Sequence, residues 1–189
     1  RSILKNTDII IAADGGANLC RSQKIKPDYI IGDFDSITYE NMEFFSDSKF
    51  IEITEQENTD LQKALGYALS LNPTKIIIVS AFGKRTDHTL SNILIFQNYE
   101  ESIPLNIYDN FGVMTLYSPG KYELKLQLGQ TISFFSLIPI KGFSLLGFKY
   151  PVVNEDHSNN FIGVSNVIIN QKCTIEFQKG KLFSYTIAV

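Results

Sequence analysis

Two aspartates spaced two residues apart follow a short apolar stretch in the first half of the chain. Asp33 and Asp35 come soon after the apolar residues 29–31. Because residues i and i+2 of an extended chain point to the same side, we expect both carboxylates to lie together at a strand end. Two neighbouring anions repel unless a cation or a shared proton compensates, and Mg²⁺ prefers carboxylate oxygens while leaving positions for phosphate. An isolated pair of this kind is more often a solvated turn, so the interpretation depends on the other polar groups along the chain.

A second candidate group follows the apolar residues 9–13. Asp14 precedes the adjacent Gly15 and Gly16, and Asn18 lies in the helix that is expected to follow. Adjacent glycines let the backbone approach a ligand closely, and the amides at a helix start favour an anion. Asp14 could hold a metal ion or a ribose hydroxyl. The alternative is a plain strand-to-helix turn with Asp14 near the N-cap, and the two interpretations have about equal weight.

A helix is predicted from Thr59, because apolar residues recur at helical spacing between residues 61 and 69. Thr59 with Gln62 fits a capping box, and Asp60 suits the first turn, which is a sufficient structural explanation. The functional interpretation is that Asp60 and Lys63, three residues apart, share a helix face away from most of the apolar residues. A carboxylate for a metal ion beside an ammonium group for phosphate is suited to phosphoryl transfer.

A fourth polar group lies between the apolar residues 76–79 and another predicted helix. Arg85 offers a planar fork for phosphate oxygens, and Asp87 either orients it or caps the helix. His88 by itself is more often a structural hydrogen-bonding residue than a catalyst. Since no serine lies in a nucleophile elbow, Ser/His/Asp hydrolase chemistry has little support.

The apolar stretches beside these groups predict the fold of the first half. Ile- and Val-rich runs alternate with helix-like segments, which is typical of a mainly parallel, doubly wound α/β sheet. Ligands of such sheets bind beyond the carboxyl ends of the strands, where these polar groups lie. The expected strands are residues 9–13, 29–31, 50–53, 76–79 and 105–108.

After about residue 110 the pattern changes to short stretches in which apolar and polar residues alternate, such as 122–128 and 173–177. Frequent glycines separate them, which predicts antiparallel strands in a small sandwich or barrel. We therefore expect two domains, residues 1–110 and residues 111–189.

Two polar features stand out in the second half. Ser165 and Asn166 lie between apolar segments, where a strand-connecting turn is the usual interpretation. Tyr150 precedes a proline and is normally a packing residue, although its ring could stack on a flat heterocycle.

The composition excludes several classes of protein. With 189 residues, 44% of them hydrophobic and 20% charged, the chain is an ordinary globular protein. A net charge of −3 without a dense basic run argues against a nucleic-acid partner. Cys20 and Cys173 lack nearby Cys or His partners, so neither a disulfide framework nor a zinc site is predicted. No apolar run approaches the ~20 residues that span a bilayer and no signal-peptide core is present, so we expect a cytoplasmic protein without membrane association.

Taken in order, the polar groups resemble those of the thiamin pyrophosphokinase family, also called thiamin diphosphokinase. The resemblance rests on five segments that occur in the family's order and span both halves of the chain. They are residues 13–18, 27–36, 59–65, 85–88 and 163–166.

The resemblance implies both a fold and a reaction. The implied fold is a mainly parallel, Rossmann-like α/β domain that binds ATP and Mg²⁺, followed by a small antiparallel β-sandwich that binds thiamin. The implied reaction transfers the pyrophosphoryl group of ATP to the hydroxyethyl oxygen of thiamin, which gives thiamin diphosphate and AMP. A homodimer with active sites between subunits is also implied, as is another strand upstream of the segment that begins here.

The resemblance further implies roles for individual residues. The implied catalytic residues are Asp33, Asp35, Asp60, Lys63, Arg85 and Asp87, and the three aspartates Asp33, Asp35 and Asp60 are the implied metal ligands. The implied nucleotide contacts are Asp14, Gly15, Gly16, Asn18 and His88. The implied thiamin contacts are Tyr150, Ser165 and Asn166.

Two positions depart from the family's pattern. Lys84 stands where a second glycine is common before the arginine, and it either adds a phosphate contact or obstructs one. Tyr150 stands where tryptophan is usual, and the chain contains no tryptophan. A tyrosine ring can still stack on a heterocycle.

Two alternative functions remain. One is a Mg-ATP pyrophosphokinase that acts on another hydroxymethyl acceptor, such as a pterin. The other is a nonenzymatic sensor of thiamin or nucleotide. Residues 163–166 in the second half favour thiamin as the acceptor, and the full set of charged residues favours an enzyme, because a sensor would not need it.

Overall fold

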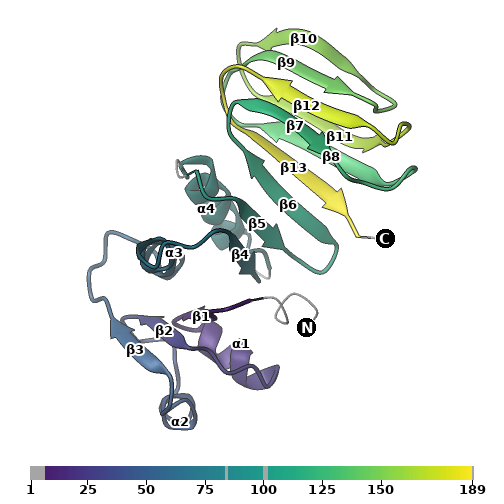
Figure 1. Ribbon diagram of the computed structural model, residues 1–189. Helices are drawn as coiled ribbons and strands as arrows, with labels where there is room; N and C mark the ends of the chain where they lie inside the picture. The colour runs from purple at the N-terminus through teal and green to yellow at the C-terminus, as the bar shows by residue number, and fades with distance from the viewer. Residues whose placement is uncertain (1–6, 84, 100–101, 189) are drawn as a thin grey trace. The chain divides into compact units, whose positions relative to one another are not determined.

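The computed structural model describes residues 7–83, 85–99 and 102–188 (Figure 1). Backbone contacts divide the chain into two compact units, Arg1–Pro73 and Thr74–Val189. Lys84, one of the two departures named above, lies outside the described residues. None of the helices in the described ranges is long and apolar enough to cross a membrane.

The first unit is built on a parallel sheet with the strand order β1–β2–β3 (Figure 1). Its strands are β1 (Ile11–Ala13), β2 (Tyr29–Gly32) and β3 (Lys49–Glu52). Its helices are α1 (Gly16–Ser22), α2 (Tyr39–Phe44) and α3 (Asp60–Ser70). The apolar residues of this unit form a core around Ile30 and Phe45, which are almost fully buried.

Helix α3 begins as its sequence predicts. Thr59 Oγ1 accepts a hydrogen bond of 3.3 Å from the Gln62 amide, and Gln62 Oε1 accepts one of 3.0 Å from the Thr59 amide. This capping box satisfies amides that the helix itself leaves without partners. Asp60 and Lys63 share a helix face as expected, with Lys63 Nζ 3.7 Å from Asp60 Oδ1, and Lys63 is buried.

The second unit holds two stacked sheets and one described helix, α4 (Thr86–Gln97) (Figure 1). The larger sheet has the order β11–β8–β13–β6–β5–β4, and the smaller has the order β10–β9–β12–β7. The strands of the larger sheet are β4 (Ile76–Val79), β5 (Leu105–Tyr108), β6 (Gly112–Tyr117), β8 (Thr131–Ser136), β11 (Phe161–Val167) and β13 (Leu182–Ile187). Those of the smaller sheet are β7 (Gly120–Leu124), β9 (Ile140–Leu146), β10 (Val152–His157) and β12 (Cys173–Phe177).

The two sheets enclose the main core of the second unit. Phe134 from the larger sheet and Phe143 and Ile175 from the smaller one are fully buried in the same apolar cluster. The described strand pairs among β6 to β13 are all antiparallel. The alternating pattern of the second half thus forms an antiparallel sandwich.

The fold is therefore mixed α/β with several sheets, and all five strands expected in the first half are present. One mainly parallel sheet that contains all five is not confirmed. β4 pairs in parallel with β5, but β5 pairs antiparallel with β6 and so belongs to the sheet of the sandwich. The domain boundary at residues 110/111 and the Rossmann-like description stay predictions.

Candidate functional site

Three carboxylates meet where β1 and β2 end. Oxygen atoms of Asp14, Asp33 and Asp35 all lie within 4.8 Å of one another. Asp14 directly follows β1 and Asp33 directly follows β2. Because the two strands are parallel and paired, their carboxyl ends lie at the same edge of the sheet. The predicted pair of aspartates is therefore part of a group that also contains Asp14.

Asp14 is the buried member of this group, with none of its surface exposed. Its Oδ2 accepts a hydrogen bond of 3.2 Å from the Ser36 amide. Its Oδ1 is buried and has no hydrogen-bond partner among the described residues. Burial raises the pKa of Asp14, and repulsion by Asp60 and Asp35 raises it further. A nearby cation would relieve both the desolvation and the repulsion.

Asp33 and Asp35 are more accessible than Asp14. Gln56 Nε2 donates a hydrogen bond of 2.9 Å to Asp33 Oδ2, and this bond lowers the pKa of Asp33. Between the two aspartates, Phe34 has a φ of 64°, a left-handed conformation that side-chain-bearing residues rarely adopt. This turn of the backbone presents the two carboxylates together.

Asp60 and Lys63 lie at the start of α3. Lys63 Nζ is 3.7 Å from Asp60 Oδ1, and the Lys63 side chain is only 3% exposed. Burial raises the pKa of Asp60, Lys63 opposes that rise, and repulsion by Asp33 and Asp35 adds to it. Asp60 is thus close enough to be influenced electrostatically by the carboxylate group, although it is not one of the three that lie within 4.8 Å.

The glycines and Asn18 have structural roles in the same unit. Gly15 is the N-cap of α1 and Gly16 is its first residue, so the backbone of both lies next to Asp14. Asn18 Nδ2 donates to the Ser36 carbonyl at 2.9 Å, and Asn18 Oδ1 accepts from Asn41 at 2.5 Å. The side chain of Asn18 therefore holds the loop that carries Asp35.

The remaining predicted phosphate residues lie in the second unit, where Arg85 is the N-cap of α4. Arg85 Nη2 and Nε donate to Asp87 Oδ2 at 2.5 Å and to Oδ1 at 3.1 Å. These bonds hold the pKa of Asp87 at about 2. Asp87 therefore orients the guanidinium, as one of the two sequence interpretations proposes. His88, the next residue, is exposed.

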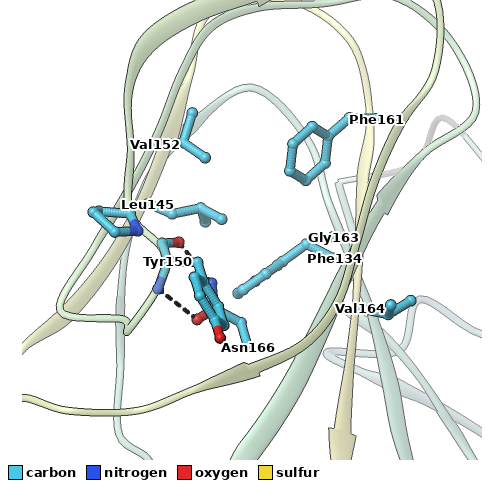
Figure 2. A pocket seen from close by; sticks show the side chains of 9 residues that line it. Phe134, Leu145, Tyr150, Val152, Phe161, Gly163, Val164 and Asn166 are labelled. Atoms are coloured by element: carbon cyan, nitrogen blue, oxygen red, sulfur yellow. Dashed lines mark hydrogen bonds between the residues drawn. The ribbon is translucent and has the colours of Figure 1, made fainter.

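A pocket of about 210 Å³ lies in the sandwich (Figure 2). Its wall is mainly apolar, with Phe134, Leu145, Val152 and Phe161 among the lining residues. Tyr150 also lines it, and 59% of Tyr150 is exposed. Two of the three predicted thiamin contacts, Tyr150 and Asn166, line this pocket, and Ser165 lies beside Asn166 in β11.

Asn166 is fixed by hydrogen bonds to the backbone of two residues. Its Oδ1 accepts from the Tyr150 amide at 3.0 Å, and its Nδ2 donates to the Tyr150 carbonyl at 2.7 Å (Figure 2). Its Oδ1 also accepts from the Val167 amide at 2.9 Å. Only 6% of Asn166 is exposed. Its amide thus holds the segment that carries Tyr150 against β11.

Ser165 does not lie in a strand-connecting turn. It lies within β11, where the pairing with β8 shifts between Gly163 and Asn166. Its φ of 57° is left-handed, and its amide donates to Ser133 Oγ at 3.0 Å. Such a bulge turns side chains out of their regular alternation.

Sequence reasoning missed two polar residues of the carboxylate site, Ser36 and Gln56. Both hydrogen-bond to its aspartates. Ser36 directly follows Asp35 and was visible as a neighbour. Gln56 reaches Asp33 from 23 residues away, and no local pattern marks it.

The carboxylate set fits a hard divalent cation. An orphaned, buried oxygen of Asp14 lies among oxygens from two other aspartates, and the set offers oxygen ligands alone. Mg²⁺ favours such ligands. This arrangement could bring a metal-bound phosphate to the edge of the sheet.

Comparisons with known proteins match two family models to the chain. A family model described as thiamin pyrophosphokinase, catalytic domain, matches residues 1–107. A second, described as thiamin pyrophosphokinase, vitamin B1 binding domain, matches residues 121–182.

Individual relatives agree as well. A thiamine pyrophosphokinase of Bacillus subtilis (strain 168) is 31% identical over 182 residues, which cover 91% of this chain and 84% of the relative. Thiamine pyrophosphokinase 1 of Arabidopsis thaliana is 27% identical over 206 residues, which cover 94% of this chain and 77% of the relative.

Solved structures show the same fold. The crystal structure of a thiamine pyrophosphokinase from Bacillus subtilis superposes with a TM-score of 0.86 at 29% identity, and the match covers 100% of this chain and 92% of that one. A family protein from Enterococcus faecalis has a TM-score of 0.83 at 24% identity, with 95% and 88% covered. With both family models matched in order along its length, the chain belongs to the thiamin pyrophosphokinase family.

Proposed function

We propose that this protein is a thiamin diphosphokinase that transfers the pyrophosphoryl group of ATP to thiamin. The observation that carries the proposal is the group of three carboxylates at the ends of β1 and β2, in a chain that also matches a vitamin B1 binding domain. In this reaction the hydroxyl oxygen of thiamin forms a bond to the β-phosphorus of ATP. The bond from the β-phosphorus to the oxygen that bridges to the α-phosphorus breaks, AMP leaves, and the hydroxyl proton is released.

We further propose that Asp14, Asp33 and Asp35 hold Mg²⁺, with Asp60 beside them. The ion would neutralise phosphate charge and orient the ATP phosphates. The buried ammonium group of Lys63 lies beside Asp60 and offers a positive charge to the phosphates.

The pocket of the sandwich is the proposed thiamin site. Its apolar wall suits a flat heterocycle, and Tyr150 offers an aromatic face at its mouth. Because both polar atoms of the Asn166 side chain bond to the backbone of Tyr150, we assign Asn166 to holding Tyr150 in place. Ser165 is exposed at the bulge of β11 and does not hold Tyr150, so it is the better polar contact for the substrate.

The topology of the larger sheet supports an active site shared between two subunits. β11, which carries Ser165, and β4, which leads toward Arg85, form opposite edges of this sheet. Five interstrand steps of about 4.8 Å place these edges about 24 Å apart. One bound thiamin is therefore not expected to lie near both Ser165 and Arg85 of the same chain. In a homodimer, the second subunit would supply the other of these two residues. Exposed Val153, Ile162 and Val164 on β10 and β11 offer an apolar contact surface.

A product assay tests the reaction. The purified protein is incubated with ATP, Mg²⁺ and thiamin, and the products are separated chromatographically. We expect AMP and thiamin diphosphate in equal amounts. ADP with thiamin monophosphate would contradict pyrophosphoryl transfer, and turnover with a hydroxymethylpterin in place of thiamin would favour the alternative acceptor. Binding of both ligands without turnover would favour a sensor.

Mixing two inactive variants tests the shared site. If Asp35 of one subunit works with Tyr150 of the other, mixed dimers of Asp35→Asn and Tyr150→Ala contain one intact site. Random mixing then restores about one quarter of the activity. If each chain builds its own site, no intact site forms and the mixture stays inactive. The cytoplasmic location remains a prediction from the sequence.

A further inference from the structure

We propose that Arg21 and Asn41 are positioning residues that set the spacing of the carboxylate group. Neither belongs to a segment that resembles the family's motifs. The inference rests on the proposed function, because it treats Asp14, Asp33 and Asp35 as a metal site.

Ser36 is the residue through which this positioning acts. Its amide donates to Asp14 Oδ2 at 3.2 Å, and its hydroxyl donates to Asp35 Oδ1 at 2.8 Å. One residue thus bonds to a carboxylate that follows β1 and to one that follows β2. The position of Ser36 therefore helps to fix how far apart these carboxylates lie.

A relay of side chains holds Ser36 from the opposite side. Its carbonyl accepts from Asn18 Nδ2 at 2.9 Å, and Asn18 Oδ1 accepts from Asn41 Nδ2 at 2.5 Å. Asn41 Oδ1 in turn accepts from Arg21 Nη1. The relay therefore runs from a guanidinium on α1, through an amide on α2, to the loop that carries Asp35.

The chemistry of Arg21 gives the relay its direction. A guanidinium can only donate, so Asn41 must turn its oxygen toward Arg21 and its NH₂ toward Asn18. Asn18 must then turn its own NH₂ toward the Ser36 carbonyl. If either amide were reversed, two hydrogen bonds would be lost. An arginine at the start of the relay thus selects the orientation that supports Ser36.

The surroundings of the relay keep it in place. Asn41 is 7% exposed, so its hydrogen bonds are sheltered from water. The Arg21 guanidinium lies 5.0 Å from the centre of the Phe44 ring, and its Nη1 is 3.6 Å from a Glu40 oxygen. Since α2 has only six residues, its position depends on such contacts rather than on its own helical stability.

The experiment compares four variants with the unchanged protein. Asn41→Leu replaces both polar atoms of the amide with methyl groups at a similar branched shape, and Arg21→Met removes the guanidinium. Arg21→Lys keeps a donor and a positive charge. Lys26→Met is the matched control, because it removes an exposed 2.8 Å ion pair with Asp47 in the same unit. Mn²⁺ affinity is measured by electron paramagnetic resonance, and exchange of the Ser36 amide proton by NMR without metal.

We expect Asn41→Leu and Arg21→Met to weaken Mn²⁺ binding about 10-fold or more, which is typical when a partner behind the ligands is lost. Exchange of the Ser36 amide should become faster in both. Arg21→Lys should recover part of the loss, and Lys26→Met should match the unchanged protein. If Asn41→Leu does not fold, the two Arg21 variants decide.

Wild-type Mn²⁺ affinity and wild-type Ser36 exchange in folded Arg21→Met would overturn the inference. If the unchanged protein fails to bind Mn²⁺, the proposed metal site is wrong. Ser36 exchange, measured without metal, then decides the relay alone: faster exchange in Arg21→Met supports it, and unchanged exchange overturns it. Failure of the relay and failure of the metal site are therefore distinguished.

Discussion

Gly32 and Asp14 are in such close contact that a Cβ added at position 32 would lie 2.7 Å from the Cβ of Asp14. Gly32 ends β2, and Asp14 follows the neighbouring strand β1. The Asp14 amide also donates to the Ile31 carbonyl at 2.8 Å, which holds Asp14 against β2. The absence of a side chain at Gly32 therefore makes room for the buried carboxylate.

Gly32→Ala should consequently displace Asp14. The new methyl group has no space, and overpacking of this kind costs about 1–3 kcal/mol of the free energy of unfolding. Urea unfolding would measure that loss, and Mn²⁺ titration would measure weaker metal binding by the folded variant. Gly66→Ala is the matched control. Gly66 lies within α3, nothing lies within 4 Å of its added Cβ, and alanine there should stabilise by about 1 kcal/mol. Equal behaviour of both variants would contradict the steric explanation.

Asp35→Asn should leave the fold intact and remove most of the Mg²⁺-dependent turnover. Asp35 is exposed, so little packing is lost, but one anionic ligand disappears. Mutation of a residue that only hydrogen-bonds to a metal ligand typically lowers metal affinity or activity about 10–100-fold. We therefore expect loss of a ligand itself to lower turnover by about 100-fold or more. Initial rates at several Mg²⁺ concentrations measure it. Asp47→Asn, which changes an exposed aspartate paired with Lys26, is the control. Unchanged activity of Asp35→Asn would remove Asp35 from the metal site.

Lys63→Met should keep the fold and reduce turnover by on the order of 100-fold, because it fills the buried volume but removes a positive charge aimed at phosphate. The pKa of Asp60 should also rise, since Lys63 lowers it in the present structure. NMR titration of the carboxyl carbon detects that rise. Lys75→Met, at an exposed lysine, is the control for loss of charge alone. Full activity with a higher Asp60 pKa would restrict Lys63 to a structural role.

Asn166→Asp should destabilise the sandwich by about 1–3 kcal/mol. The substitution replaces the Nδ2 donor with an oxygen that faces the Tyr150 carbonyl, so a partly buried acceptor loses its partner. Thermal unfolding measures the loss, and the KM for thiamin should rise because Tyr150 is less firmly held. Asn170→Asp is an exposed control. A rise in KM without a loss of stability would instead indicate direct contact between Asn166 and the substrate.

Tyr185→Phe should change the acid stability of the second unit. Burial raises the pKa of Asp109, but bonds from the Tyr185 hydroxyl at 2.6 Å and from two backbone amides at 2.8 Å lower it more, below its ordinary value of 3.8. The folded carboxyl therefore binds its proton less readily than the unfolded one. The stability from this difference is present above pH 3.8 and is lost as the pH falls through the lower folded value.

Removing the Tyr185 hydroxyl should reduce stability near neutral pH by about 0.5–1.5 kcal/mol and make the decline below pH 4 shallower. Urea unfolding at neutral and acid pH compares the two proteins. Tyr39→Phe is the control, because Tyr39 is 78% exposed. An acid decline as steep in Tyr185→Phe as in the unchanged protein would show that the hydroxyl does not set the pKa of Asp109.

The strands of the first half could be predicted because each is a short stretch made mostly of apolar residues. The partners of these strands could not. Ile76–Val79 reads like Tyr29–Gly32 in sequence, yet β4 joins the sheet of the sandwich through β5 and β6. An apolar run reports burial, whereas pairing depends on which other edge is available, and that is a property of the whole chain.

The candidate site was predictable where chemistry follows from neighbours in sequence. Asp33 and Asp35 are two residues apart and lie together as expected, but a left-handed turn at Phe34 brings them together instead of the extended geometry that was expected. That Asp14 joins them depends on the parallel pairing of β1 and β2, which no local pattern records. The burial of Lys63 was not predicted, because helical periodicity shows which residues share a face but not which other parts of the chain cover that face.

Phe34 and Ser165 share a left-handed backbone, with φ values of 64° and 57°. Such a conformation costs a side-chain-bearing residue on the order of 1 kcal/mol, and glycine would adopt it with less strain. Phe34 also packs against the core of the first unit, so glycine there would lose more than the relief of strain gains. A search for heat-resistant variants should therefore find glycine at Ser165, which is exposed. The same replacement would loosen the bulge beside Asn166. At this place thermal robustness and catalytic fitness are opposed, and selection for one should erode the other.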